Sequence, residues 1–113
     1  MNIERREMPR FPVNLTISKV NNRPLFGRIK DLSRRGMRAL LDTDVFAEKS
    51  DIKLEIQRPD YNALIPVTAC VVWKKSFAGK SEVGLEFKNI PVEDKVDLLD
   101  YSYAAWLKTL TNR

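Results

Sequence analysis

The sequence has no histidine and a single cysteine, Cys70, among its 113 residues. Without histidine, the chain lacks the commonest general base and the commonest metal ligand. One cysteine excludes an intrachain disulfide, a zinc ribbon and a redox thiol pair. The four glycines are scattered, which excludes a glycine-rich loop for phosphate. These absences predict a protein that is not an enzyme and that needs no metal or other cofactor.

Long apolar runs are also missing. The longest, ACVVW at residues 69–73, is far shorter than the ~20 residues that a membrane-spanning helix needs. No apolar stretch typical of a signal peptide follows the charged N-terminal residues. We therefore expect no membrane span and, because a lone cysteine suits a reducing compartment, a cytoplasmic location. Cys70 lies within the apolar run and is expected to be a small buried side chain.

The positive charge is unevenly distributed. The chain has 20 Lys+Arg and 15 Asp+Glu, for a net charge of +5. Residues 1–38 hold ten basic and three acidic residues, whereas residues 39–113 hold ten basic and twelve acidic ones. Eight of the ten arginines lie in the first segment. Since arginine presents a planar fork of donors that fits phosphates and base edges, this segment favours an anionic partner, the bland alternative being a solvated charged surface.

Apolar and polar residues alternate along most of the chain after residue 12, which is typical of half-buried strands. The alternating segments, separated by turns, cover residues 13–18, 25–32, 37–41, 52–57, 64–73 and 83–87. About six short strands with short turns suggest a small antiparallel barrel. Residues 1–11 are dense in charge and interrupted by Pro9, so we expect a flexible basic arm there. Residues 12–113 are then a single barrel domain that includes a C-terminal helix.

The pattern changes near the C-terminus, where apolar residues recur at alternating steps of four and three. This spacing predicts an amphipathic helix over residues 91–111. The apolar stripe consists of Val92, Val96, Leu99, Tyr103, Trp106 and Leu110. Glu93 and Asp94 near the start and Lys108 near the end suit the helix dipole. We expect the stripe to pack against the barrel; the alternative is that it docks a partner or a second copy, so the chain is a monomer or a homodimer.

Two short motifs carry residues with binding chemistry. RxxxR places Arg6 and Arg10 four positions apart in the predicted arm. DLSRRG at residues 31–36 combines an acid (Asp31), a hydroxyl (Ser33) and a glycine (Gly36) at a strand-to-strand turn. RxxxR alone is common by chance in an arginine-rich chain, whereas DxSxxG is expected only roughly 0.01 times from this composition. The two motifs in this order therefore form a strong joint signal.

Together the motifs resemble the PilZ domain, a bacterial family of receptors for cyclic di-GMP that is marked by RxxxR followed by [D/N]xSxxG. The segment EVGLEF at residues 82–87 is similar to the closing strand of that family, and the resemblance extends over nearly the whole chain. It implies a mainly β fold: a six-stranded antiparallel barrel with a C-terminal helix and a flexible N-terminal arm. It also implies a non-enzymatic receptor that binds cyclic di-GMP and signals to a protein partner when the ligand orders the arm.

The chemistry of cyclic di-GMP explains the residue types of the motifs. The O6 and N7 edge of guanine accepts hydrogen bonds from an arginine fork, and Arg6 or Arg10 could also stack on the base or bind a phosphate. The N1–H and N2–H₂ edge needs an acceptor, which Asp31 supplies. Ser33 can donate to a phosphate or accept from the base. Gly36 permits a positive φ or a close backbone approach.

Arg5 and Arg35 complete the predicted ligand-binding site. Arg5 stands where, in the PilZ family, the residue is associated with ligand stoichiometry, so two ligands per protomer is our hypothesis. Arg35, with Arg34 and Arg38, adds phosphate contacts or is only solvated.

Two alternative functions stay open at this point. A small basic barrel could bind single-stranded nucleic acid, although Asp31 in the middle of the site disfavours this. A PilZ fold that has lost its ligand could serve as an adaptor. The motifs do not identify the downstream partner or pathway.

Overall fold

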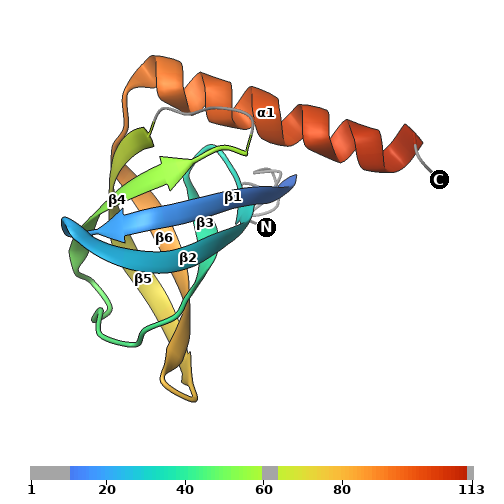
Figure 1. The fold of residues 1–113 in the computed structure, drawn as a ribbon. Helices are drawn as coiled ribbons and strands as arrows, with labels where there is room; N and C mark the ends of the chain where they lie inside the picture. The colour runs from blue at the N-terminus through green and yellow to red at the C-terminus, as the bar shows by residue number, and fades with distance from the viewer. Residues whose placement is uncertain (1–10, 60–63, 112–113) are drawn as a thin grey trace, which may run out of the picture.

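The computed structural model of the chain describes residues 11–59 and 64–111. Six strands and one helix follow one another in the predicted order (Figure 1). They are β1 (Phe11–Val20), β2 (Arg23–Leu32), β3 (Gly36–Leu41), β4 (Asp51–Gln57), β5 (Leu64–Phe77), β6 (Lys80–Asn89) and α1 (Val92–Thr111). The mainly β fold that the sequence predicts, with a single C-terminal helix, is confirmed.

The strands form a closed antiparallel barrel in the order β1-β2-β3-β6-β5-β4. β1 closes it by pairing with β2 on one side and with β4 on the other. Among the described residues, closure gives every strand a partner on both sides within the barrel itself. It also brings β3 beside β6, so that the turn between β2 and β3 lies next to a strand far away in the sequence.

The core follows directly from the alternation in the sequence. On β4, for example, Ile52, Leu54 and Ile56 are buried, whereas Lys53 between them is exposed. The other strands contribute inward residues in the same way, so apolar side chains fill the barrel interior. Burial of one apolar face is the main favourable term for such a barrel, at about 25 cal/mol per Å² of apolar surface.

Two strands extend further than the alternation predicts. β5 continues to Phe77 and β6 begins at Lys80, so these strands form a hairpin whose tip projects from the barrel (Figure 1). The prediction ended β5 at residue 73 because polar residues follow. Outside the barrel neither face of the hairpin covers a core, so the alternation disappears while the pairing persists. β1 likewise begins at Phe11, inside the predicted arm, because Phe11 pairs with Leu32.

The helix α1 forms where the sequence predicts it, but the predicted stripe packs against the barrel only in part, through Leu99 and Trp106. The residues buried against the barrel are Leu98 and Ser102, and the hydroxyl of Ser102 donates to the carbonyl of Leu98 at 2.8 Å. Most of the apolar stripe stays exposed. Tyr103, for example, is 48% exposed. A serine is tolerated in the packed face because its hydroxyl is satisfied inside the helix.

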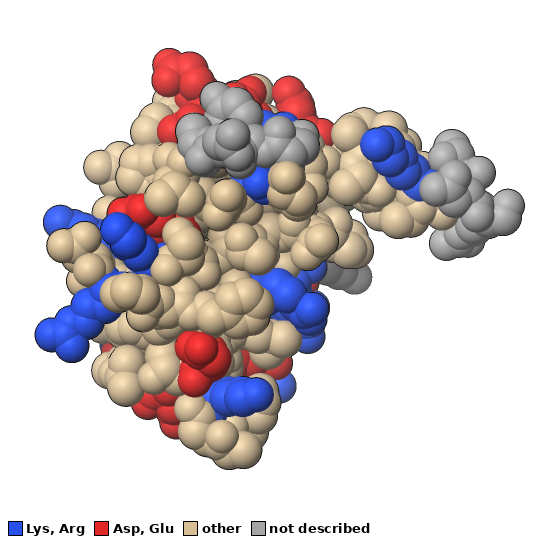
Figure 2. All heavy atoms as spheres, viewed as in Figure 1, with Lys and Arg blue, Asp and Glu red and all other residues tan. Residues whose placement is uncertain are grey.

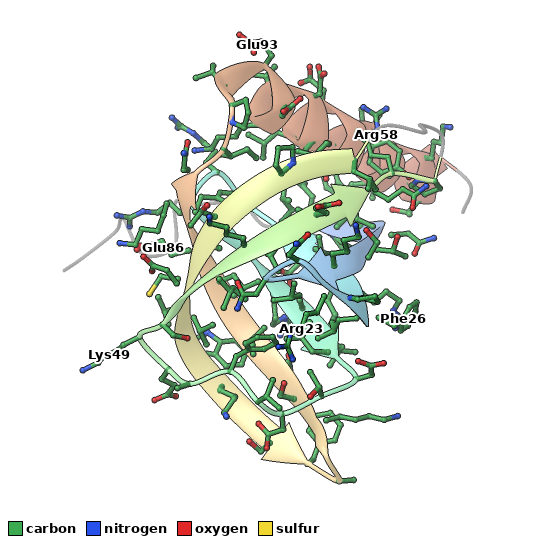
Figure 3. All side chains as sticks on the ribbon, turned by 60° about the vertical axis from the view of Figure 1, so that its left-hand side comes forward. Arg23, Phe26, Lys49, Arg58, Glu86 and Glu93 are labelled. Carbon is green, nitrogen blue, oxygen red and sulfur yellow. The ribbon has the colours of Figure 1, made fainter. Side chains whose placement is uncertain are left out.

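Aromatic and cationic contacts fix α1 to the barrel beside β1. Phe11, the first residue of β1, lies with its ring 5.6 Å from that of Tyr103 and 5.7 Å from that of Trp106. A second contact is made by Arg58, which follows β4. Its guanidinium lies 4.8 Å from the ring centroid of Tyr101 on α1, and Figure 3 shows Arg58 next to the helix. The start of β1 and the C-terminal half of α1 therefore share one aromatic cluster.

The prediction that Cys70 is buried is wrong. Cys70 is half-buried, because its side chain alternates away from the barrel interior while Ala69 and Val71 point inward. No helix in the described ranges is long and apolar enough to cross a membrane. Residues 11–59 and 64–111 contain no group of three or more Cys, Asp or Glu side chains that could hold a metal ion.

Candidate functional site

The DxSxxG motif forms the tight connection between β2 and β3. Ser33 is buried, and its backbone N–H donates to the carbonyl of Gly36 at 2.8 Å. The hydroxyl of Ser33 lies 3.4 Å from the same carbonyl oxygen. Arg34 and Arg35 between them are exposed at the tip of the turn. The serine therefore closes the turn, and the two arginines face the solvent.

Gly36 is required by a close approach between strands rather than by a positive φ. A Cβ atom at this position would lie 1.9 Å from the carbonyl oxygen of Leu85 on β6. Gly36 pairs with Glu86, and the N–H of Phe87 donates to the carbonyl of Arg35 at 2.8 Å. Of the two roles that the sequence suggested for this glycine, the close backbone approach is the one observed, and the backbone it meets is that of β6.

Asp31, at the end of β2, is a buried carboxylate held by a neighbouring strand. Its side chain is 10% exposed, and Arg38 Nη2 donates to its Oδ2 at 2.7 Å. The two residues are directly opposite in the β2–β3 ladder. Glu82 on β6 lies 3.6 Å from Arg38 Nε and 3.7 Å from Lys30 Nζ. An alternating row of charges thus crosses the outer surface of β2, β3 and β6, with Asp31 in its most buried place.

A cavity of about 370 Å³ lies beside Asp31 on the same surface. Its lining residues are Asp31, Met37, Arg38, Val72, Trp73, Gly84 and Leu85. Trp73 packs directly onto Gly84, where a Cβ atom would lie 2.1 Å from the indole nitrogen. The cavity therefore combines an aromatic ring, a carboxylate and a guanidinium. Cavities of about 510 and 600 Å³ include residues of the β1–β2 turn in their lining, and one of about 460 Å³ lies between Arg58 and α1.

The predicted site residues fall into two groups. Asp31, Ser33, Arg35 and Gly36 lie together at the β2–β3 turn. Arg5, Arg6 and Arg10 lie outside the described residues. The first described residues of the chain nevertheless border the motif, because Phe11 pairs with Leu32 and Pro12 pairs with Asp31.

The PilZ domain family model matches residues 4–104 of the sequence. The chain belongs to the PilZ domain family. The resemblance inferred from the two motifs is therefore confirmed. A comparison with curated proteins finds no match.

Solved structures share the fold of this PilZ domain. The inhibitor of motility MotI/DgrA from Bacillus subtilis superposes with a TM-score of 0.74 at 21% identity. YcgR from Escherichia coli in complex with c-di-GMP gives 0.73 at 18% identity, and the PilZ domain of YcgR with c-di-GMP gives 0.71 at 17%. Each match covers 96% of this chain, but only 53% of MotI and 49% of the longer YcgR chain, against 95% of the isolated YcgR domain.

The sequence did not predict the ion pairs that two charged residues form beside the DxSxxG motif. Arg38 was considered only as a phosphate contact or a solvated charge, yet it binds Asp31. Glu82 was given no role of its own, yet it lies against Arg38. The alternation along β3 and β6 predicts that both side chains lie on the outer surface. Their opposite charges were the signal in the sequence that they could form an ion pair. Which acid meets which base depends on the register between strands.

Replacing Arg38 by glutamine should destabilise the PilZ domain by about 1 kcal/mol, because the Asp31 carboxylate is mostly buried while its partner is partly exposed. Urea denaturation measures this change. The matched control is Arg28→Gln, which removes the same charge from an exposed position on β2 and should change the unfolding free energy by less than about 0.5 kcal/mol. Equal effects of the two variants would show that the Asp31 ion pair contributes nothing specific.

Proposed function

We propose that this PilZ domain is a receptor for cyclic di-GMP and that the β2–β3 turn is its binding site. The observation that carries the proposal is the buried Asp31 carboxylate, held between an arginine and a cavity at the DxSxxG turn. The YcgR structures with the same fold are complexes with c-di-GMP, which supports the same ligand class for this family member.

The proposed role of Asp31 is to accept the N1–H and N2–H₂ donors of one guanine. An ionised carboxylate has about four lone-pair directions, so Asp31 can accept from a base while Arg38 keeps its contact with Oδ2. Adenine presents an acceptor at the ring nitrogen that corresponds to N1 of guanine. An adenine in the same place would leave a carboxylate oxygen facing a lone pair, at a cost of about 1–3 kcal/mol. The site should therefore prefer guanine.

The proposed role of the N-terminal segment is to supply arginines to the same ligand. Phe11 pairs with Leu32 next to the β2–β3 turn, and Arg10 is the residue before Phe11 in the sequence. The proposed arm, which ends where β1 begins at Phe11, would bring Arg6 and Arg10 onto the phosphates or the O6 and N7 edge of guanine. Arg5 and Arg35 would extend the contacts. Ligand binding would then order the arm and present a changed surface to a protein partner.

Titration calorimetry with cyclic di-GMP, cyclic di-AMP and GMP tests this proposal. We expect binding of cyclic di-GMP, binding of cyclic di-AMP that is weaker by at least about tenfold, and weak binding of GMP, which carries one base and one phosphate group. The same titration counts ligands: a ratio near two supports the hypothesis of two ligands per protomer, and a ratio near one refutes it. If cyclic di-GMP gives no heat of binding and an oligonucleotide binds instead, the proposed receptor function is refuted.

A further inference from the structure

The apolar stripe of α1 remains largely uncovered by its own barrel. We call Val92, Val96, Leu99, Tyr103, Trp106 and Leu110 the helix seam. Val92 is 74% exposed, Val96 49% and Leu110 40%. Phe11 takes up part of the rings of Tyr103 and Trp106, yet the seam holds several of the large apolar side chains that stay exposed in the described part of the chain. Contiguous exposed apolar surface of this kind marks an interaction site.

The seam lies beside the packed face of α1 and meets the barrel along one edge, where Leu99 packs against the core and Trp106 contacts Phe11. The buried residues are Leu98 and Ser102, and at about 100° per residue the seam lies about a third of a turn away from them. α1 lies against β1, and its C-terminal end runs past the barrel (Figure 1). A second helix could therefore lie along the seam while the barrel stays on a different side of α1.

The spacing within the seam matches that of a surface that packs on another helix. The steps of 4, 3, 4, 3 and 4 residues repeat every seven residues, as the a and d positions of a coiled coil do. In this register Val96, Tyr103 and Leu110 occupy a positions, and Val92, Leu99 and Trp106 occupy d positions. Such a seam is self-complementary, because the same residues recur on a second copy.

The charges beside the seam favour parallel helices. Lys95 occupies a g position and Asp100 the following e position, and these two positions face each other across a parallel pair. Lys95 lies at the barrel side of the seam, with its ammonium 5.6 Å from the ring centroid of Phe87. An antiparallel pair in full overlap would instead bring Asp100 against its own copy. The charges at the ends of α1, acidic where the helix begins and basic toward its far end (Figure 2), suit the dipole of the helix itself and do not select the orientation of a partner.

We propose that the helix seam is the contact surface between two copies of this chain, with the two α1 helices packed in parallel. Each copy places its barrel to the side of the helix pair, so the β2–β3 turns of both remain accessible. The assembly does not require cyclic di-GMP, and the proposal goes beyond the receptor function and stands independently of it.

Sedimentation equilibrium of the ligand-free protein tests the assembly. We expect the mass of a dimer for the unaltered chain and of a monomer for Tyr103→Glu and for Leu110→Glu, because each places a charge in the seam of both copies. Phe77→Glu is the matched control: Phe77 is 49% exposed, against 48% for Tyr103, but lies at the end of β5. It should leave the dimer intact. Circular dichroism checks that each variant is folded, and Leu110→Glu lies where the helix has passed the barrel.

Disulfide cross-linking tests the orientation. In a Cys70→Ser background, Val96→Cys should form a covalent dimer, because equal a positions face each other only in a parallel pair and a disulfide needs Cβ atoms about 3.5–4.5 Å apart. A monomer at every concentration, or a dimer that persists in both seam variants, would overturn the proposed surface. A covalent dimer that forms only between Val96→Cys and Trp106→Cys chains would overturn the parallel arrangement.

Discussion

Replacing Asp31 by asparagine is expected to weaken the binding of cyclic di-GMP by at least about tenfold, equivalent to about 1.4 kcal/mol or more. Asparagine has almost the shape of aspartate, but it presents one acceptor and one donor group. Its NH₂ would face a guanine N–H, so one hydrogen bond is lost and a donor is left unpaired in a mostly buried place. Calorimetric titration of both proteins measures the change, and the preference for cyclic di-GMP over cyclic di-AMP should narrow in the variant.

The matched control for this prediction is Asp42→Asn. Asp42 is exposed, follows β3 and lines the cavity at the β1–β2 turn instead of the one beside Arg38. The control makes the same chemical change and the same change in net charge, so a non-specific electrostatic effect would appear equally in both variants. Thermal denaturation must show that Asp31→Asn remains folded despite the altered contact with Arg38. Equal affinities of the two variants would remove Asp31 from the binding site.

The barrel and its motif turn could be predicted from the sequence because their determinants are local. Each strand buries one face, so alternation marks it, and the DxSxxG residue types fit a tight turn. The partner of Asp31 was not predictable in the same way. Arg38 reaches it because the β2–β3 register, shifted by an irregularity between Ile29 and Asp31, sets Arg38 directly opposite. Register over a shifted ladder depends on the whole barrel.

The helix α1 shows a second reason why structure could not be predicted fully from the sequence. Its apolar stripe correctly predicted an amphipathic helix, but an apolar stripe indicates only that a surface can be covered, not what covers it. The barrel takes the face with Leu98 and Ser102, where a small polar residue allows close packing and hydrogen-bonds within the helix. The expectation that the most apolar face meets the core therefore holds only along one edge of the stripe, at Leu99 and Trp106.

Replacing Gly36 by alanine is expected to lower the free energy of unfolding by about 3 kcal/mol or more. The added Cβ would lie 1.9 Å from the carbonyl oxygen of Leu85 and 2.9 Å from its carbonyl carbon. Both atoms belong to the backbone of β6, so no side chain can rotate away. The strands must separate, which weakens the β3–β6 pairing and the bond from Phe87 N–H to the Arg35 carbonyl. Since whole domains are stable by about 5–15 kcal/mol, this loss is large.

Gly79→Ala is the control that separates this clash from the ordinary effects of replacing a glycine. Gly79 has a φ of 77° and no atom within 4 Å of the position a Cβ would take, so alanine there should cost only about 1–2 kcal/mol through backbone strain. Urea denaturation of both variants gives the comparison. If Gly36→Ala costs no more than Gly79→Ala, β6 can yield, and the glycine of DxSxxG is not fixed by this contact. If the expected difference is found, the motif glycine sets the spacing of β3 against β6 and thereby the position of the turn that holds Ser33 and Asp31.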